Sequence, residues 1–172
     1  MKTLYLLRHA KAAPEASLGD ARRPLAKRGR KAAKAMAEFL GKLDPAPELI
    51  LCSTSLRTRE TLELILPALA PPPAVTYEDG LYLAEASELL ERLRKLRKDA
   101  QCVLLIGHNP GLHELAARLA ADAGRLVEGF PTGALAALQL PGAWAELQWQ
   151  KARLMLYQTP KALTRDLDSE AD

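Results

Sequence analysis

An apolar run near the start of the chain ends abruptly in Arg8 and His9. Residues 4–7 read Leu-Tyr-Leu-Leu, a pattern typical of a buried strand. Such a strand would present both side chains at its carboxyl end, where open α/β sheets bind ligands. An arginine fork binds phosphate oxygens, and an imidazole can attack phosphorus or donate a proton. The pair therefore suggests a phosphate site, although a surface arginine beside a partly buried histidine would leave the same short motif.

Two further apolar runs end in residues of the same chemistry. Residues 48–52 are followed by Ser53 and, in the first turn of a predicted helix, by Arg57. Residues 102–106 are followed by a glycine and then by His108. The chain has only three histidines, so two of them at strand ends are informative. Because parallel strands end at one edge of a sheet, we expect these side chains to converge with the first arginine–histidine pair on one anion.

The elements that must position these residues alternate between strands and helices. Predicted strands cover residues 4–7, 48–52, 74–77 and 102–106, and predicted helices cover 26–43, about 56–69, 87–98 and 112–121. This alternation predicts a mostly parallel sheet with helices on both faces. Ser87 is expected to cap the third helix, and Asn109 with Pro110 to provide the N-cap and first residue of the fourth.

The C-terminal part is predicted to complete the sheet at its edge. Residues 134–140 and 145–156 read as two strands joined in a hairpin at Pro141–Gly142. From about Thr159 onward the apolar periodicity is lost and the chain ends in acid, which favours a frayed tail. The expected fold is a three-layer α/β/α sandwich, with a mostly parallel central sheet and an antiparallel edge. It would form a single domain over residues 1–158, followed by a tail over 159–172.

The composition argues against several classes of protein. With 172 residues, 48% hydrophobic and 26% charged, the chain is typical of a globular domain with a real core. No stretch has the length of a membrane span and no signal peptide is evident, so we expect a cytoplasmic protein without a membrane partner. A net charge of +3 is too small to indicate nucleic acid. Cys52 and Cys102 lack Cys or His neighbours at metal-ligand spacing, which predicts buried free thiols, no metal and no cofactor.

Three motifs carry a family resemblance. They are Leu-Arg-His-Ala at 7–10, Ser-x-x-x-Arg-x-x-x-Thr at 53–61, and Gly-His-Asn-Pro at 107–110. In this order the set resembles the histidine phosphatase superfamily, the phosphoglycerate mutase-like family. The short chain, the missing insertion domain and Arg-Pro-Leu-Ala-Lys-Arg-Gly at 23–29 are similar to its SixA branch, the phosphohistidine phosphatases. The resemblance extends from residue 2 to about residue 156 and implies a phosphoglycerate mutase-like fold.

The resemblance implies a metal-independent phosphatase. His9 would be the nucleophile and would be phosphorylated transiently, while Arg8, Arg57 and His108 would hold the phosphoryl oxygens. Phosphoryl transfer needs mainly positioning and positive charge, and side chains can supply both. The nucleophilic histidine must be neutral at the attacking nitrogen, with its other nitrogen held by a hydrogen bond.

The remaining site candidates are less constrained. Lys11 and Asn109 are candidates for substrate binding at the rim of the site. Many family members carry a carboxylic general acid after the third strand, but here that segment departs from their glutamate-rich pattern. Asp79 in this segment and Asp20 in the loop after the nucleophile are the candidates, although Asp79 also suits a simple turn.

The weak acid candidates bear on the substrate. An alkoxide leaving group needs a proton donor, whereas an imidazole is easily protonated because histidine titrates near ~6.5. We therefore expect the substrate to be phosphohistidine on a protein, such as a histidine phosphotransfer domain. A small phosphorylated metabolite, such as a sugar or nucleotide phosphate, is the alternative substrate. A third possibility is a phosphate-binding module without turnover.

Overall fold

The computed structural model describes residues 1–14 and 17–171, with the side chains of residues 166–171 excepted. Within these residues the strands are β1 (Lys2–Arg8), β2 (Leu49–Ser53), β3 (Ala74–Glu78), β4 (Cys102–Gly107), β5 (Leu135–Leu140) and β6 (Arg153–Gln158). The α-helices are α1 (Lys27–Leu40), α2 (Leu56–Ile65), α3 (Ala86–Arg94), α4 (Gly111–Leu119) and α5 (Pro160–Ala171).

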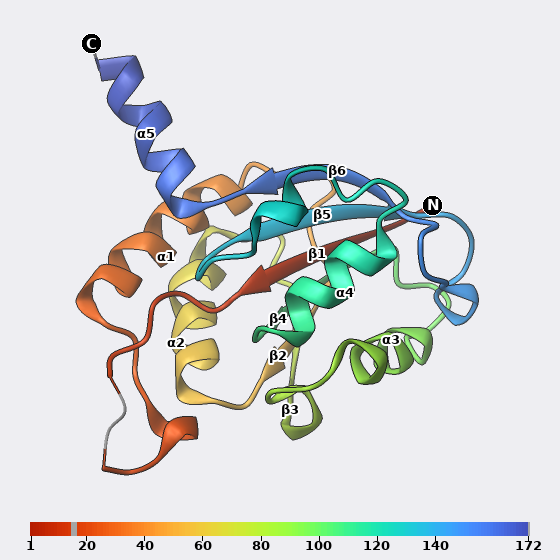
Figure 1. The fold of residues 1–172 in the computed structure, drawn as a ribbon, viewed down its shortest axis with the longest axis horizontal. Helices are drawn as coiled ribbons and strands as arrows, with labels where there is room; N and C mark the ends of the chain where they lie inside the picture. The colour runs from red at the N-terminus through yellow and green to blue at the C-terminus, as the bar shows by residue number, and fades with distance from the viewer. Residues whose placement is uncertain (15–16, 172) are drawn as a thin grey trace.

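One sheet organises the described part of the chain (Figure 1). Its strand order is β3-β2-β4-β1-β5-β6. The first four strands in this order are mutually parallel, whereas β5 is antiparallel to β1 and β6 is antiparallel to β5. Helices α1 and α2 cover one face of the sheet, and α3 and α4 cover the other (Figure 1). The predicted α/β/α sandwich with an antiparallel edge is confirmed.

Strand β1 shows how the sheet divides the core into two halves. Leu4 and Leu6 pack into the cluster beneath α3 and α4, whereas Tyr5 and Leu7 pack into the cluster beneath α1 and α2. Successive side chains of a strand point to opposite faces, so a continuous apolar run is what a strand buried on both sides requires. Cys52 and Cys102 are buried free thiols, as predicted. This double burial gives the strand ends a rigid support.

The predicted antiparallel strand pair at the sheet edge is confirmed, but its tight turn at Pro141–Gly142 is wrong. Strand β6 begins only at Arg153, and the connection from β5 contains a 3-10 turn at Trp144–Glu146. The Trp144 side chain is buried, and its indole N–H donates to the Ala100 carbonyl at 2.8 Å. Burying a large aromatic ring with its polar atom satisfied stabilises the turn over a continued strand.

Two predicted helix starts are also wrong. Helix α3 is capped by Glu85, whose capping box with Glu88 replaces the predicted cap at Ser87. Helix α4 begins at Gly111 after Pro110, so Asn109 is not its N-cap. A Cβ atom at Gly111 would lie 1.9 Å from the Ala84 carbonyl oxygen, which explains a glycine at this close approach.

The C-terminal segment forms a helix where the sequence pattern predicts a frayed tail. Helix α5 covers Pro160–Ala171 and begins beside α1. Leu163 packs against the core cluster beneath α1 and α2, and contacts of this kind between distant segments leave no periodic signal in the sequence. The division into a domain of residues 1–158 and a tail stays a prediction. Among the described residues, no helix combines the length and apolar character needed to cross a membrane.

Candidate active site

The carboxyl ends of β1, β2 and β4 bring His9, Arg57 and His108 together. These strands are parallel neighbours in the sheet, so their ends share one edge. The two imidazole centroids lie 5.2 Å apart. The Arg57 guanidinium faces both rings, with Nε 3.4 Å from His9 Nε2 and Nη2 3.4 Å from His108 Nδ1. All three side chains are buried. The convergence expected from the strand ends is confirmed.

His9 is held in one tautomer by its own backbone. Its Nδ1 lies 2.7 Å from the Ala10 carbonyl oxygen, which can only accept a hydrogen bond, so Nδ1 carries the proton. The Nε2 lone pair is then left facing Arg57. Burial lowers the pKa of His9 to about 4, and the nearby charge of Arg57 acts in the same direction. At neutral pH, His9 therefore presents an unprotonated Nε2 to the site.

The serine and the threonine of the motif at 53–61 form hydrogen bonds that position the site. Ser53 Oγ lies 2.8 Å from His108 Nε2 and orients that ring. Four residues after Arg57, Thr61 Oγ1 accepts a hydrogen bond from the Ala10 amide at 3.0 Å. The same hydroxyl donates to the Arg57 carbonyl at 2.7 Å. The serine and the threonine of this motif thus fix the second histidine and the loop that carries the first.

His108 is neutral in the unliganded pocket. Burial, with smaller contributions from the neighbouring His9 and Arg57, lowers its pKa to about 3. The edge-to-face contact with the Tyr82 ring, 5.3 Å between centroids, helps to exclude water from the imidazole. A bound anion would add negative charge beside Nδ1 and would favour the protonated, donating form of His108.

Arg8 brings an unpaired donor to the same edge. Its Nη1 donates to the Phe130 carbonyl at 3.2 Å. Its Nε is buried and has no hydrogen-bond partner among the residues that the structure describes. Burial, followed by the charge of Arg57, lowers the pKa of the Arg8 guanidinium. A buried donor without a partner is costly, so this atom is well suited to an anionic ligand.

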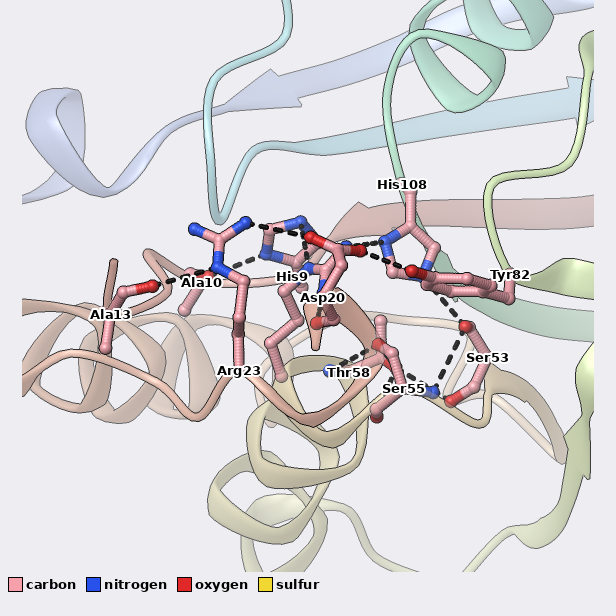
Figure 2. Close-up of polar contacts among 11 residues, drawn as sticks. His9, Ala10, Ala13, Asp20, Arg23, Ser53, Ser55, Thr58, Tyr82 and His108 are labelled. Carbon is pink, nitrogen blue, oxygen red and sulfur yellow. Dashed lines mark hydrogen bonds and ion pairs between the residues drawn. The ribbon is translucent and has the colours of Figure 1, made fainter. Parts of the chain in front are cut away.

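The two carboxylate candidates occupy different places. Figure 2 shows Asp20 between Arg23 and Tyr82, with its oxygens turned toward both. Asp20 Oδ2 lies 3.1 Å from Arg57 Nη2, so this carboxylate belongs to the pocket. Asp79 instead accepts a hydrogen bond from Thr54 Oγ1 at 2.6 Å. Of the two candidates, only Asp20 contacts the residues that converge on His9.

Asp20 is ionised at neutral pH. The hydrogen bond from the Tyr82 hydroxyl lowers its pKa to about 2, with smaller contributions from Arg23 and Arg57. An ionised carboxylate cannot donate a proton, so Asp20 is a poor general acid in this arrangement. Tyr82 has no place among the sequence candidates, because a lone tyrosine after a turn carries no periodic or motif signal.

The two weaker candidates lie beside the pocket. Lys11 is exposed and lines a surface groove next to the site. Asn109 donates from Nδ2 to the Phe130 carbonyl at 2.7 Å, the same oxygen that accepts from Arg8. Asn109 therefore fixes the loop that supports Arg8. Among the described residues, no three His, Cys, Asp or Glu side chains are grouped as metal ligands would be.

Comparisons with known proteins agree with this geometry. The model of the histidine phosphatase superfamily (branch 1) matches residues 4–87. A Mycobacterium tuberculosis protein without an assigned function is 32% identical over 165 residues, which cover 90% of this chain and 100% of that protein.

Solved structures extend the match to the whole fold. A Nakamurella multipartitia protein assigned as the phosphohistidine phosphatase SixA is 34% identical with a TM-score of 0.80, covering 92% of this chain and 96% of that chain. The protein histidine phosphatase SixA in complex with tungstate is 26% identical with a TM-score of 0.78, covering 94% of this chain and 99% of that chain. The chain belongs to the histidine phosphatase superfamily and is of the SixA type.

Proposed function

We propose that the protein is a metal-independent phosphatase that removes phosphate from phosphohistidine on a protein through a phosphorylated His9. One observation carries the proposal. The tautomer of His9 aims an unprotonated Nε2 at a pocket formed by Arg57, His108 and Arg8. A neutral nucleophile among forked cationic donors is the arrangement that in-line attack on a phosphoryl group requires.

In the first step, Nε2 of His9 attacks phosphorus. A new nitrogen–phosphorus bond forms as the bond between phosphorus and the substrate imidazole breaks. Arg8, Arg57 and protonated His108 stabilise the charge on the three equatorial oxygens. The leaving imidazole takes a proton from solvent, since its conjugate acid titrates near ~6.5.

In the second step, water attacks phosphorus and the His9–phosphorus bond breaks. The water gives up a proton to the departing phosphate or to solvent, and the bond electrons return to Nε2. His9 is thereby restored as the neutral tautomer, still held by the Ala10 carbonyl. Inorganic phosphate is the product.

The state of the carboxylates supports the choice of substrate. Asp20 is ionised and bound by two arginines and Tyr82, while Asp79 is bound to Thr54. Neither side chain is arranged to protonate an alkoxide, which is the leaving group of a sugar or nucleotide phosphate. An imidazole leaving group makes no such demand. The likeness to SixA structures, one of them a protein histidine phosphatase, supports the same substrate class.

The deciding experiment replaces the nucleophile. We expect His9→Ala to abolish turnover of a phosphohistidine peptide while the protein stays folded, because it removes the neutral imidazole nitrogen that faces Arg57 Nε. A brief reaction of the wild type with labelled substrate should leave acid-labile phosphate on the chain, and His9→Ala should leave none. Arg30→Ala, which removes an exposed ion pair with Glu60, is the matched control. Full activity in His9→Ala would overturn the proposal.

The substrate class is tested side by side. We expect kcat/KM on a phosphorylated histidine phosphotransfer domain to exceed that on a panel of sugar and nucleotide phosphates. A sugar phosphate preferred by orders of magnitude would replace the phosphohistidine assignment with a metabolite phosphatase. Binding of inorganic phosphate without any turnover would indicate a phosphate-binding module.

A further inference from the structure

A long groove lies beside the pocket, between α1 and the start of α5. Its volume is about 1020 Å³. The first turns of both helices and the segment at Pro131 and Thr132 form its walls. Its apolar surface comes from alanine and proline side chains, namely Ala32, Ala35, Pro131 and Pro160. The groove is therefore an open surface feature with an apolar lining, and it is separate from the buried pocket around His9.

The rim of the groove is basic throughout. Its charged side chains are all cations and all exposed: Lys11, Arg28, Lys31, Lys161 and Arg165. Among the described residues, none of these five forms an ion pair with a carboxylate, and no Asp or Glu lines the groove. Arg30 on the same helix does pair with Glu60, whereas Arg28 and Lys31 on the groove side have no such carboxylate partner among the described residues.

The backbone joins the groove directly to His9. Lys11 follows His9 by two positions, and its carbonyl accepts from the Ala26 amide at 2.9 Å. A Cβ at Gly29 would lie only 2.0 Å from the same carbonyl oxygen, so α1 is packed against the loop that follows His9. On the other wall, the Gly133 amide donates to the His9 carbonyl at 3.0 Å, directly after Thr132. The groove therefore lies beside the loop that carries His9, within reach of a large substrate.

We propose that this groove docks an acidic segment of the phosphoprotein substrate, next to its phosphohistidine. The proposal rests on the function proposed above and names the feature by which the protein partner is recognised. The volume of the groove is at the upper end of the ~300–1,000 Å³ typical of small-molecule sites. Its cations are exposed, unlike the buried guanidinium of Arg57. Separated positive charges around an apolar lining are complementary to the negative charges and the apolar face of an acidic amphipathic segment.

Long-range attraction is the expected contribution of the groove. Clefts lined by charge of one sign raise association rates by roughly 10–10³-fold, and the effect falls with ionic strength. The groove should therefore act on the encounter with the phosphoprotein and leave the chemistry at His9 unchanged. Removing the charge of the groove should therefore raise KM for a protein substrate, and adding salt to the wild type should raise KM in the same way.

The test reverses charge inside and outside the groove on one helix. The groove variant is Arg28→Glu with Lys31→Glu. The control is Lys27→Glu with Lys34→Glu, which makes the same charge change at exposed positions of α1 that do not line the groove. Both are assayed on a phosphotransfer domain with an acidic face around its phosphohistidine, on that domain with those acids replaced by lysine, and on a short neutral phosphohistidine peptide.

For the acidic domain, we expect kcat/KM of the groove variant to fall at least about tenfold, mainly through KM, and that of the control to change less than about twofold. The lysine-substituted domain should regain activity with the groove variant, and all proteins should process the neutral peptide alike. Equal losses in the two variants, or a loss on the peptide as well, would overturn the docking site. Wild-type activity on the peptide reports the proposed function independently, and its absence would overturn both proposals.

Discussion

The catalytic pocket and the basic groove use positive charge in opposite ways. In the pocket, the Arg57 guanidinium is buried and every nitrogen has a partner within 3.4 Å. In the groove, the cations are exposed at the ends of long side chains. Fixed donors stabilise a transition state, whereas mobile surface charges attract and orient a partner. One short segment contributes to both regions, because His9 lies in the pocket and Lys11 lines the groove.

This difference between buried and exposed cations indicates which region can determine substrate specificity. In the proposed mechanism, the side chains of the pocket act on the phosphoryl group and have no role in recognising the rest of the substrate. The groove offers contacts of another kind at a place that a large substrate can reach. Experiments that damage one region while sparing the other therefore separate chemistry from recognition.

The largest effect is expected for Arg57→Lys in the pocket. Lysine keeps the charge but loses the fork that contacts His9, His108 and Asp20 together. By analogy with the loss of one oxyanion donor, kcat should fall by roughly 10²–10³-fold on every substrate. Steady-state kinetics on the neutral peptide and on the phosphoprotein should show the same loss, unlike the groove variant.

Circular dichroism and thermal unfolding serve as the control for this variant. Unchanged kinetics in a folded Arg57→Lys protein would show that Arg57 is only structural. A loss confined to the phosphoprotein would erase the distinction between pocket and groove.

A smaller effect is expected on stability as the pH falls. Burial holds the pKa of His9 at about 4 and that of His108 at about 3, below the ordinary ~6.5 of an unfolded chain. Below pH ~6.5 the unfolded state therefore binds protons that the folded state does not. Each histidine should then remove up to about 1.4 kcal/mol of unfolding free energy per pH unit, and the full stability is present only above this range.

Urea unfolding at pH 7.0 and pH 5.5 measures this slope. His108→Gln should flatten it, whereas the groove variant Arg28→Glu with Lys31→Glu should keep it, since those positions lie outside the histidine pocket. A wild-type stability that is constant over this range would show that the pocket histidines are not held neutral.

The smallest effect is expected for Asp20→Asn. The amide keeps a hydrogen-bonding oxygen for Arg57 but cannot hold a negative charge. Because the carboxylate is already ionised beside Tyr82, its loss removes no proton donor, and kcat on phosphohistidine should change by less than about tenfold. A fall of several orders of magnitude in kcat, strongest on alkyl phosphates, would make Asp20 the general acid.

Much of this pocket could be predicted because it lies at strand ends. The apolar runs before His9, Ser53 and His108 are local signals, and parallel strands bring their ends together by geometry. The meeting of two histidines and an arginine follows from residue types and position, whereas the burial of Arg57 and the neutral state of His108 follow from the packing around them. The expectation of a hydrogen-bonded nitrogen on the nucleophile is met by the Ala10 carbonyl.

The parts that the sequence does not reveal depend on contacts between distant segments. Asp20 reaches Tyr82 and Arg57 from a loop without periodicity, and no local rule ranks it above Asp79. The 3-10 turn at Trp144 exists because its indole meets Ala100. Helix α5 packs beside α1, and its Leu163 contacts the core. In each case tertiary packing outweighs the local pattern.

The hydrogen bond between His9 and the Ala10 carbonyl also determines the regiochemistry of the proposed phosphohistidine intermediate. An imidazole can be phosphorylated at either nitrogen, giving two isomers with different hydrolytic stability. Since Nδ1 is occupied by the carbonyl at 2.7 Å, only Nε2 is open to phosphorus. The trapped phosphoenzyme should therefore be a single isomer, recognised by an antibody or a nuclear magnetic resonance signal specific for Nε2-phosphohistidine. One backbone oxygen thus makes the covalent intermediate chemically unique.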